Sequence, residues 1–188
     1  VKSTVPLAKP FKRAKKIEYS YDAGEDADIE KKHYLTVNWK LPDTSDPVLN
    51  FSFHILEDAL IGTPASPLKK ALLDSGLGED LAGLGLESEL REMIFSTGLK
   101  GTRARHAKKI ETLIIETLQN LVRDGIDPET IAAAINTLEF QLRENNTGGF
   151  PRGIAVMLRS LTTWLHEGDP FSMLSFEAPL TEIKSRYA

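Results

Sequence analysis

The sequence of 188 residues contains no cysteine, which excludes disulfide bonds, cysteine nucleophiles and thiolate metal sites. It also lacks any apolar run near the roughly 18 residues that a membrane-spanning helix needs. Its first residues show no basic stretch followed by an apolar one, which is the pattern of a secretory signal. We therefore expect a soluble protein without a membrane partner, and the compartment stays open.

A large excess of one charge is missing as well. Lys and Arg total 23, Asp and Glu total 27, and the net charge is -4. Because dedicated nucleic-acid-binding domains are strongly basic, we predict no nucleic-acid partner. Binding of nucleic acid through two basic clusters is only a third hypothesis, since few aromatic residues lie among the basic ones. The clusters are Lys9, Lys12, Arg13, Lys15 and Lys16, and Lys100, Arg103, Arg105, Lys108 and Lys109.

The remaining composition, 41% hydrophobic and 27% charged, is that of an ordinary globular protein. A chain of this length buries roughly 70% of its unfolded surface, so it is long enough to form a core. The chain starts with Val1 rather than Met, which we interpret as a sign that it is part of a longer protein.

Alternating apolar residues predict strands at 14–21 and 33–41, which we expect to pair antiparallel. Their inward residues are Ile17, Tyr19 and Tyr21, and Leu35, Val37, Trp39 and Leu41. Residues 79–90 and 91–99 predict two more strands, of which the first is weakened by Gly83 and Gly85.

Helix start and stop signals predict the rest of the chain. Asp46 and Ser66, each followed by Pro, begin two helices that end at Gly62 and Gly76. Further helices are expected over 103–124, from Pro128 to about residue 144, over 150–166 and over 180–187, with an extended connector at 168–179. In the helix over 150–166 we expect an inward stripe of Ile154, Met157, Leu158, Leu161 and Leu165.

Strands that are segregated from a helical run predict an α+β fold, a mostly antiparallel sheet of about four strands with helices packed on one face. We divide the chain into a lead-in linker at 1–12, an α+β domain at 13–167, and a connector with the start of a further helix at 168–188.

One short motif carries candidate metal chemistry. Zinc peptidases of one class place H-x-x-E-H on a helix, so that both His side chains reach one zinc and the Glu acts as base. Here His54 and Glu57 fit the first and fourth positions, and Asp58 stands in place of the second His. Because His-x-x-Glu is common by chance and no third ligand is visible, we predict no catalytic and no metal-binding residues. His54, Glu57 and Asp58 remain weak candidates.

Four basic residues are candidates for contacts with a peptide or another domain. Arg103, Arg105 and Lys108 begin a helix, where positive charge opposes the helix dipole and a partner can supply the negative charge. Arg152 follows the turn-rich stretch 146–151. For all four, a solvated surface or a plain corner between helices is the alternative.

Several longer stretches together are specific. They are residues 61–68 (IGTPASPL), 73–78 (LDSGLG), 95–101 (FSTGLKG), 138–148 (LEFQLRENNTG), 150–153 (FPRG) and 169–171 (DPF). In this order they resemble the presequence protease branch of the insulinase/pitrilysin zinc metallopeptidases. The resemblance runs from about residue 33 to residue 180.

The resemblance implies a fragment of a large peptidase built from related α+β repeats, whose halves close around a peptide chamber. In that family zinc is held in the first repeat by H-x-x-E-H and a downstream Glu. This chain is similar to the second, non-catalytic repeat and the start of the linker between the halves. The helix with His54 then corresponds to the zinc-binding helix, with Asp58 where the second His belongs. No ligand or base role is carried over to this chain.

We therefore expect a non-catalytic structural domain of a zinc metallopeptidase that degrades short unstructured peptides, forming part of the chamber wall. The resemblance implies no cofactor in this chain, zinc in the parent enzyme, and the catalytic repeat, the C-terminal half and a peptide as partners. The alternative is a stand-alone peptide- or protein-binding module that adds a strand to an exposed edge such as 14–21. The first hypothesis predicts an exposed apolar patch, through which the isolated chain can self-associate.

Overall fold

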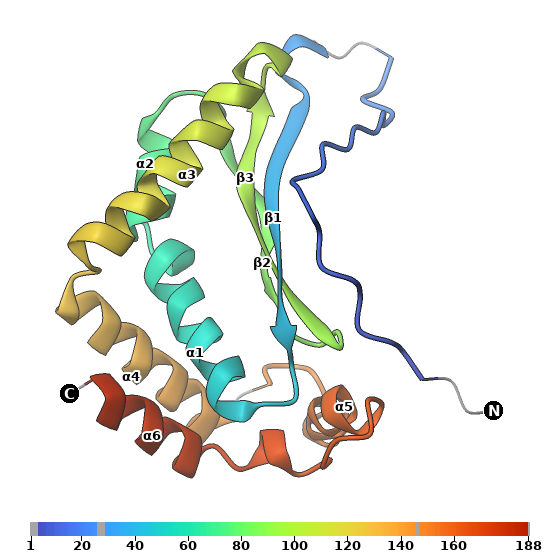
Figure 1. The fold of residues 1–188 in the computed structure, drawn as a ribbon, viewed down its shortest axis with the longest axis vertical. Coiled ribbons are helices and arrows are strands. Elements are labelled where there is room, and N and C mark those ends of the chain that lie inside the picture. The colour runs from blue at the N-terminus through green and yellow to red at the C-terminus, as the bar shows by residue number, and fades with distance from the viewer. Residues whose placement is uncertain (1–3, 26–28, 146, 188) are drawn as a thin grey trace.

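The computed structural model describes residues 4–25, 29–145 and 147–187. It shows a three-stranded antiparallel sheet with helices on one face (Figure 1). The strands are β1 (His33–Asp43), β2 (Asp80–Glu87) and β3 (Glu92–Thr102), in the order β1-β3-β2. The predicted α+β fold is confirmed, but the predicted count of four strands is wrong.

The register of the sheet places its apolar side chains on the helical side. Leu35 pairs with Leu99, Val37 with Thr97, and Trp39 with Phe95. The rings of Trp39 and Phe95 lie 5.7 Å apart. Because paired residues in an antiparallel sheet share a face, the alternation in 33–41 points these side chains into one core. That core is completed by Leu60, Leu68, Leu72, Leu99, Ile110 and Ile114.

The described residues form six α-helices. They are α1 (Pro47–Glu57), α2 (Pro67–Asp74), α3 (Ala107–Asp124), α4 (Pro128–Glu144), α5 (Arg152–Trp164) and α6 (Glu177–Tyr187). Helices α1, α2 and α3 pack against this side of the sheet, and α4 and α6 pack against α1. Of the two predicted capping residues Asp46 and Ser66, only Asp46 makes a capping hydrogen bond with its side chain. Asp46 caps α1 by accepting hydrogen bonds from the amides of Val48, at 2.9 Å, and Leu49, at 3.2 Å. A second core cluster joins α1, α4 and α6 through Ile55, Ala59, Ala134, Ile135 and Leu180. No helix within the described residues is long and apolar enough to cross a membrane.

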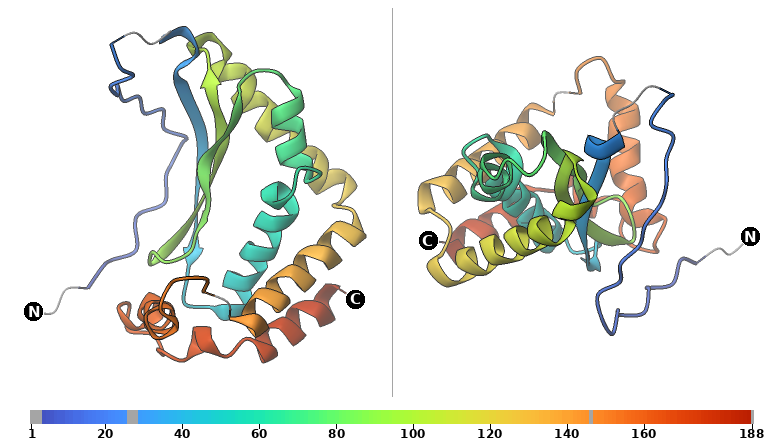
Figure 2. Two further views of the ribbon diagram at one scale, coloured as in Figure 1. Left: turned by 180° about the vertical axis from the view of Figure 1, so that it is seen from behind. Right: turned by 90° about the horizontal axis from the view of Figure 1, so that it is seen from above.

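The predicted strand over 14–21 does not form, and its pairing with 33–41 is wrong. The exposed fractions of Ile17, Tyr19 and Tyr21 are 68%, 91% and 53%. Residues 4–25 run past the sheet on the side away from the helices (Figures 1 and 2). There the Ala8 amide donates to Glu92 Oε2 at 2.6 Å, and the Tyr21 ring meets Tyr34 edge to face. Among the described residues, no layer of structure covers this side, so the alternating side chains find nothing to bury them.

Helix α5 forms as predicted, but its apolar stripe does not face inward. Thr163 is its only buried residue, and Ile154, Met157, Leu158 and Leu165 are exposed. The stretch 168–179 is also less extended than expected, because it contains a 3-10 turn (Ser172–Leu174) and α6 starts at Glu177.

Candidate functional site

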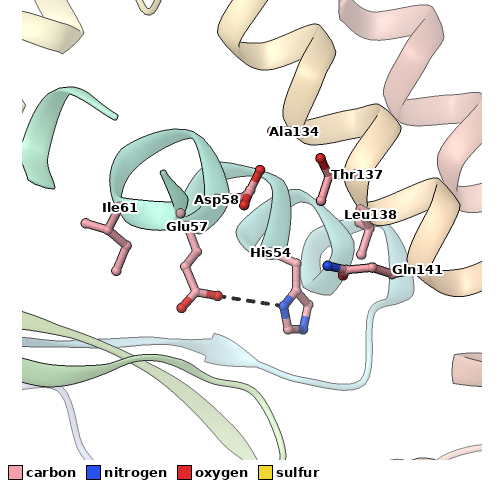
Figure 3. Close-up of a pocket in the computed structure, with 9 residues that line it drawn as sticks. His54, Glu57, Asp58, Ile61, Ala134, Thr137, Leu138 and Gln141 are labelled. Atoms are coloured by element: carbon pink, nitrogen blue, oxygen red, sulfur yellow. Dashed lines mark ion pairs between the residues drawn. The ribbon is translucent and has the colours of Figure 1, made fainter. Parts of the chain in front are cut away.

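The candidate residues His54 and Glu57 lie on the last turn of α1. This helix continues as a π-helical turn (Asp58–Gly62), a rare geometry that is frequent at functional sites. Figure 3 shows both side chains on the side of α1 that faces the sheet, with His54 Nδ1 3.9 Å from Glu57 Oε2. Asp58 does not join them, because its carboxylate points to the α4 side of the helix.

The Glu57 carboxylate is already engaged by the sheet. Its Oε1 accepts a hydrogen bond from the amide of Leu86 at 2.7 Å. Burial raises the pKa of Glu57, and the hydrogen bond from Leu86 partly opposes that shift. Glu57 therefore ties the end of α1 to β2, which is a structural role that explains its position without catalysis.

His54 is half-buried beside the turn that joins β2 and β3. Its Nε2 lies 3.1 Å from Ser88 Oγ, and the tautomer decides which of the two donates. Burial lowers the pKa of His54, so the ring is neutral at pH 7.

The three weak metal candidates do not assemble into a zinc site. Structural and catalytic zinc sites take three or four protein ligands. In the described ranges no group of three His, Asp or Glu side chains is placed to hold a metal ion. His54 and Glu57 approach each other, and Asp58 lies apart from them.

A hollow of about 260 Å³ opens between α1 and α4 at this point. Its polar lining includes His54, Glu57 and Asp58 from the α1 side, and Thr137 and Gln141 from α4 (Figure 3). A half-buried carboxylate, a neutral imidazole and a side-chain amide can bind polar groups by hydrogen bonds. The arrangement can therefore bind a polar group in this hollow.

The four basic candidates do not form one surface. Arg103, Arg105 and Lys108 lie together at the start of α3, whereas Arg152 begins α5 at the other end of the molecule (Figure 1). Arg103 lies 3.8 Å from Glu30, and Lys108 lies 3.1 Å from Glu111. Two of the charges at the α3 start are therefore partly satisfied within the chain.

Sequence reasoning missed the partners that define the site. These partners lie far from His54 along the chain. The Leu86 amide belongs to β2, Ser88 to the turn after β2, and Gln141 to α4. The sequence signal for the contact with Leu86 is Gly85, which predicts a weakened strand but in the structure leaves space for the Glu57 side chain.

Comparison with known proteins gives consistent results. Residues 3–138 match the family described as "Peptidase M16 inactive domain". The chain is 43% identical over 187 residues to "Presequence protease 1, chloroplastic/mitochondrial" of Arabidopsis thaliana, covering 99% of this chain and 17% of that protein. It is 31% identical over 171 residues to "Presequence protease, mitochondrial" of Xenopus laevis, covering 89% of this chain and 16% of that protein.

A third relative is "Protein HypA" of Clostridium perfringens, with 32% identity over 185 residues, 98% of this chain and 19% of the relative. The chain thus spans less than a fifth of the length of each of these proteins. The family match covers well over half of the chain, and the presequence proteases align along nearly all of it. The chain therefore belongs to the M16 peptidase family, as an inactive domain of the presequence protease branch.

Proposed function

We propose that this chain is a supporting domain in a zinc metallopeptidase that degrades short unstructured peptides, and that it forms part of the wall of the peptide chamber. The observation that carries the proposal is the match of residues 3–138 to the inactive domain of the family. The geometry supports it, because Asp58 lies apart from His54 and Glu57 and Glu57 serves as a tie to β2.

Zinc then belongs to another repeat of the parent enzyme, and this chain contacts that catalytic repeat, the C-terminal half and the peptide. The exposed apolar stripe of α5 supports contact with another domain, since a stripe of this kind is normally covered. The family-derived part of the proposal, a chamber and a peptide substrate, rests on the names of the relatives and on the resemblance.

The test is to measure zinc content and zinc-dependent cleavage by the purified chain. We expect no retained zinc after dialysis and no cleavage of an unstructured peptide, as followed by mass spectrometry. Stoichiometric zinc with chelator-sensitive cleavage that is lost in both His54→Ala and Glu57→Ala would overturn the non-catalytic assignment.

The wall role needs the parent enzyme that contains this chain. We expect a photo-crosslinker at Asn38, on the sheet face that no helix covers, to capture bound peptide. A matched crosslinker at Glu116, exposed on the outer side of α3, is the control and should capture none. Equal capture at both positions, or at neither, contradicts a wall formed by the open sheet face.

A further inference from the structure

A second hollow, of about 650 Å³, adjoins the smaller one between α1, α4 and α5. Both hollows are lined by His54, Leu138 and Gln141, so they meet at the end of α1. The larger one lies within the range of roughly 300–1,000 Å³ that is typical of ligand pockets. It has the size to hold a small ligand, and the supporting role leaves it unexplained.

Among the described residues, the side chains of Arg159 and Gln141 line this hollow without a partner of their own. Arg159 of α5 is half-buried and pairs with no carboxylate within the described residues. Gln141 of α4 makes no side-chain hydrogen bond within the same residues, and Figure 3 shows its amide on the His54 side of α4. A guanidinium matches a carboxylate in two-point geometry, and a side-chain amide matches a peptide group because it both donates and accepts.

Half of the remaining lining residues are apolar. They include Phe51 of α1, Leu138 and Leu142 of α4, Phe150 before α5, and Leu158 of α5. Phe150 and Leu158 are 48% and 43% exposed, so apolar surface remains open beside Arg159. The hollow thus combines a cation, an amide and an apolar surface within one ligand-sized space.

We propose that this hollow binds the carboxyl-terminal end of a short peptide whose last side chain is apolar. Arg159 pairs with the terminal carboxylate, Gln141 hydrogen bonds to the preceding peptide group, and the apolar wall covers the last side chain. A fatty acid satisfies Arg159 and the wall but offers nothing to Gln141, so a peptide fits better. This binding site adds detail to the proposed function. It rests on that function in one respect, which is that this domain contacts peptides.

Acidic side chains near the hollow repel a bound carboxylate and therefore weaken its binding. Glu89 lines the hollow and is exposed, and it forms no ion pair with Arg159 among the described residues. Glu57 and Asp58 line the smaller hollow, where Glu57 is held by the amide of Leu86. Glu89 is therefore the carboxylate that most opposes a bound anion in the larger hollow.

The experiment is equilibrium binding of a labelled peptide ending in Leu, measured with the full chain in the presence of a metal chelator. We expect saturable binding that weakens at least about tenfold when the terminal carboxylate is amidated or when Arg159→Gln is introduced. Combining the two changes should add little, because both remove the same ion pair. Glu89→Gln should tighten binding by about twofold. Arg123→Gln is the matched control with unchanged binding, since Arg123 pairs with Asp124 at the end of α3.

Three outcomes overturn the proposal. The first is equal binding of the free and amidated peptides, and the second is an unchanged affinity in Arg159→Gln with an unchanged melting temperature. The third is equally tight binding of dodecanoate with no effect of Gln141→Ala, which identifies a site for apolar acids. The chelator prevents zinc-dependent cleavage during the binding measurement, and the mass of the recovered peptide shows whether cleavage occurred. Zinc-dependent cleavage would contradict the supporting role of the domain but would not contradict the binding site.

Discussion

The Glu57 carboxylate occupies space that a glycine at position 85 leaves free. A Cβ atom at Gly85 would lie 2.0 Å from Glu57 Oε1, and the backbone φ of Gly85 is +69°. Both observations require glycine, one through volume and the other through a conformation that other residues adopt at a cost. The irregular stretch of β2 around Gly85 also directs the Leu86 amide toward Glu57. The tie between α1 and β2 thus depends on two residues 28 positions apart along the chain.

Gly85→Ala should lower the free energy of unfolding by about 2 kcal/mol, because it adds both backbone strain and the contact with Glu57. Urea unfolding measures this value. Gly125→Ala isolates the strain, since its φ is +83° and nothing lies within 4 Å of the added Cβ. If Gly85→Ala lowers the free energy of unfolding no more than Gly125→Ala does, the contact with Glu57 is not tight. The same conclusion follows if adding Glu57→Ala to Gly85→Ala recovers none of the lost free energy.

The ionisation of His54 and of Glu57 should affect stability in opposite directions as the pH falls. Burial lowers the pKa of His54 from its ordinary value of 6.5. On acidification the unfolded chain therefore takes up this proton first, and the folded state loses stability from about pH 6.5 down to the lowered pKa. Burial raises the pKa of Glu57 above its ordinary 4.5, so its protonation stabilises the folded state from the raised pKa down to about pH 4.5.

His54→Gln should therefore flatten the loss of stability that begins as the pH falls below about 6.5, whereas Glu57→Gln should make the net loss steeper above about pH 4.5. The groups that face His54 are Glu57 at 3.9 Å, Ser88 at 3.1 Å, and Glu89 in the neighbouring hollow. Urea unfolding at several pH values measures both slopes in each variant. Parallel profiles for the wild type and His54→Gln would contradict a lowered pKa of the half-buried His54 ring.

Among the helices and strands, the sequence correctly predicts those features that depend on neighbouring residues in the chain, such as helix starts. Asp46 and Asp127, each before Pro, mark the starts of α1 and α4, and both side chains accept amide hydrogen bonds in the structure. The alternation in 33–41 correctly predicts β1, because its inner face meets a core. The same alternation in 14–21 fails, since periodicity records which side chains share a face but not whether another layer covers them.

The candidate site was predicted in the same partial way. Helical spacing correctly brings His54 and Glu57 together on one face of α1. The sequence could not show that Asp58 points away, because α1 changes to a π-helical turn at that residue. It could not show Leu86 or Ser88 either, since β2 and the turn that follows reach α1 only through tertiary packing.

Helix α5 shows how an element can form without being covered. Its apolar residues recur at helical spacing, and the helix begins at Arg152, within the predicted range 150–166. The neighbouring element that it contacts most closely is the short turn Ser172–Leu174. The spacing therefore predicted the helix correctly and its burial wrongly, because no layer within the described residues covers its apolar face.

For the whole molecule, the exposed face of α5 predicts association. We expect the chain to bind an apolar fluorescent dye and to sediment as a mixture of monomers and larger species at high concentration. Met157→Lys combined with Leu165→Lys should reduce dye binding and shift the mixture to monomers, because both side chains are more than half exposed on this face. Since neither is buried, the free energy of unfolding should change by no more than about 0.5 kcal/mol.

Val122→Lys is the control, because Val122 is 88% exposed but lies on α3, away from the α5 face. It adds one positive charge without touching that face, so it should leave dye binding and sedimentation unchanged. A chain that is monomeric at every concentration and binds no dye would mean that the α5 face is covered in solution. The same reduction in Val122→Lys would assign the association to net charge. A loss confined to the α5 variant identifies this face as the surface through which the chain associates.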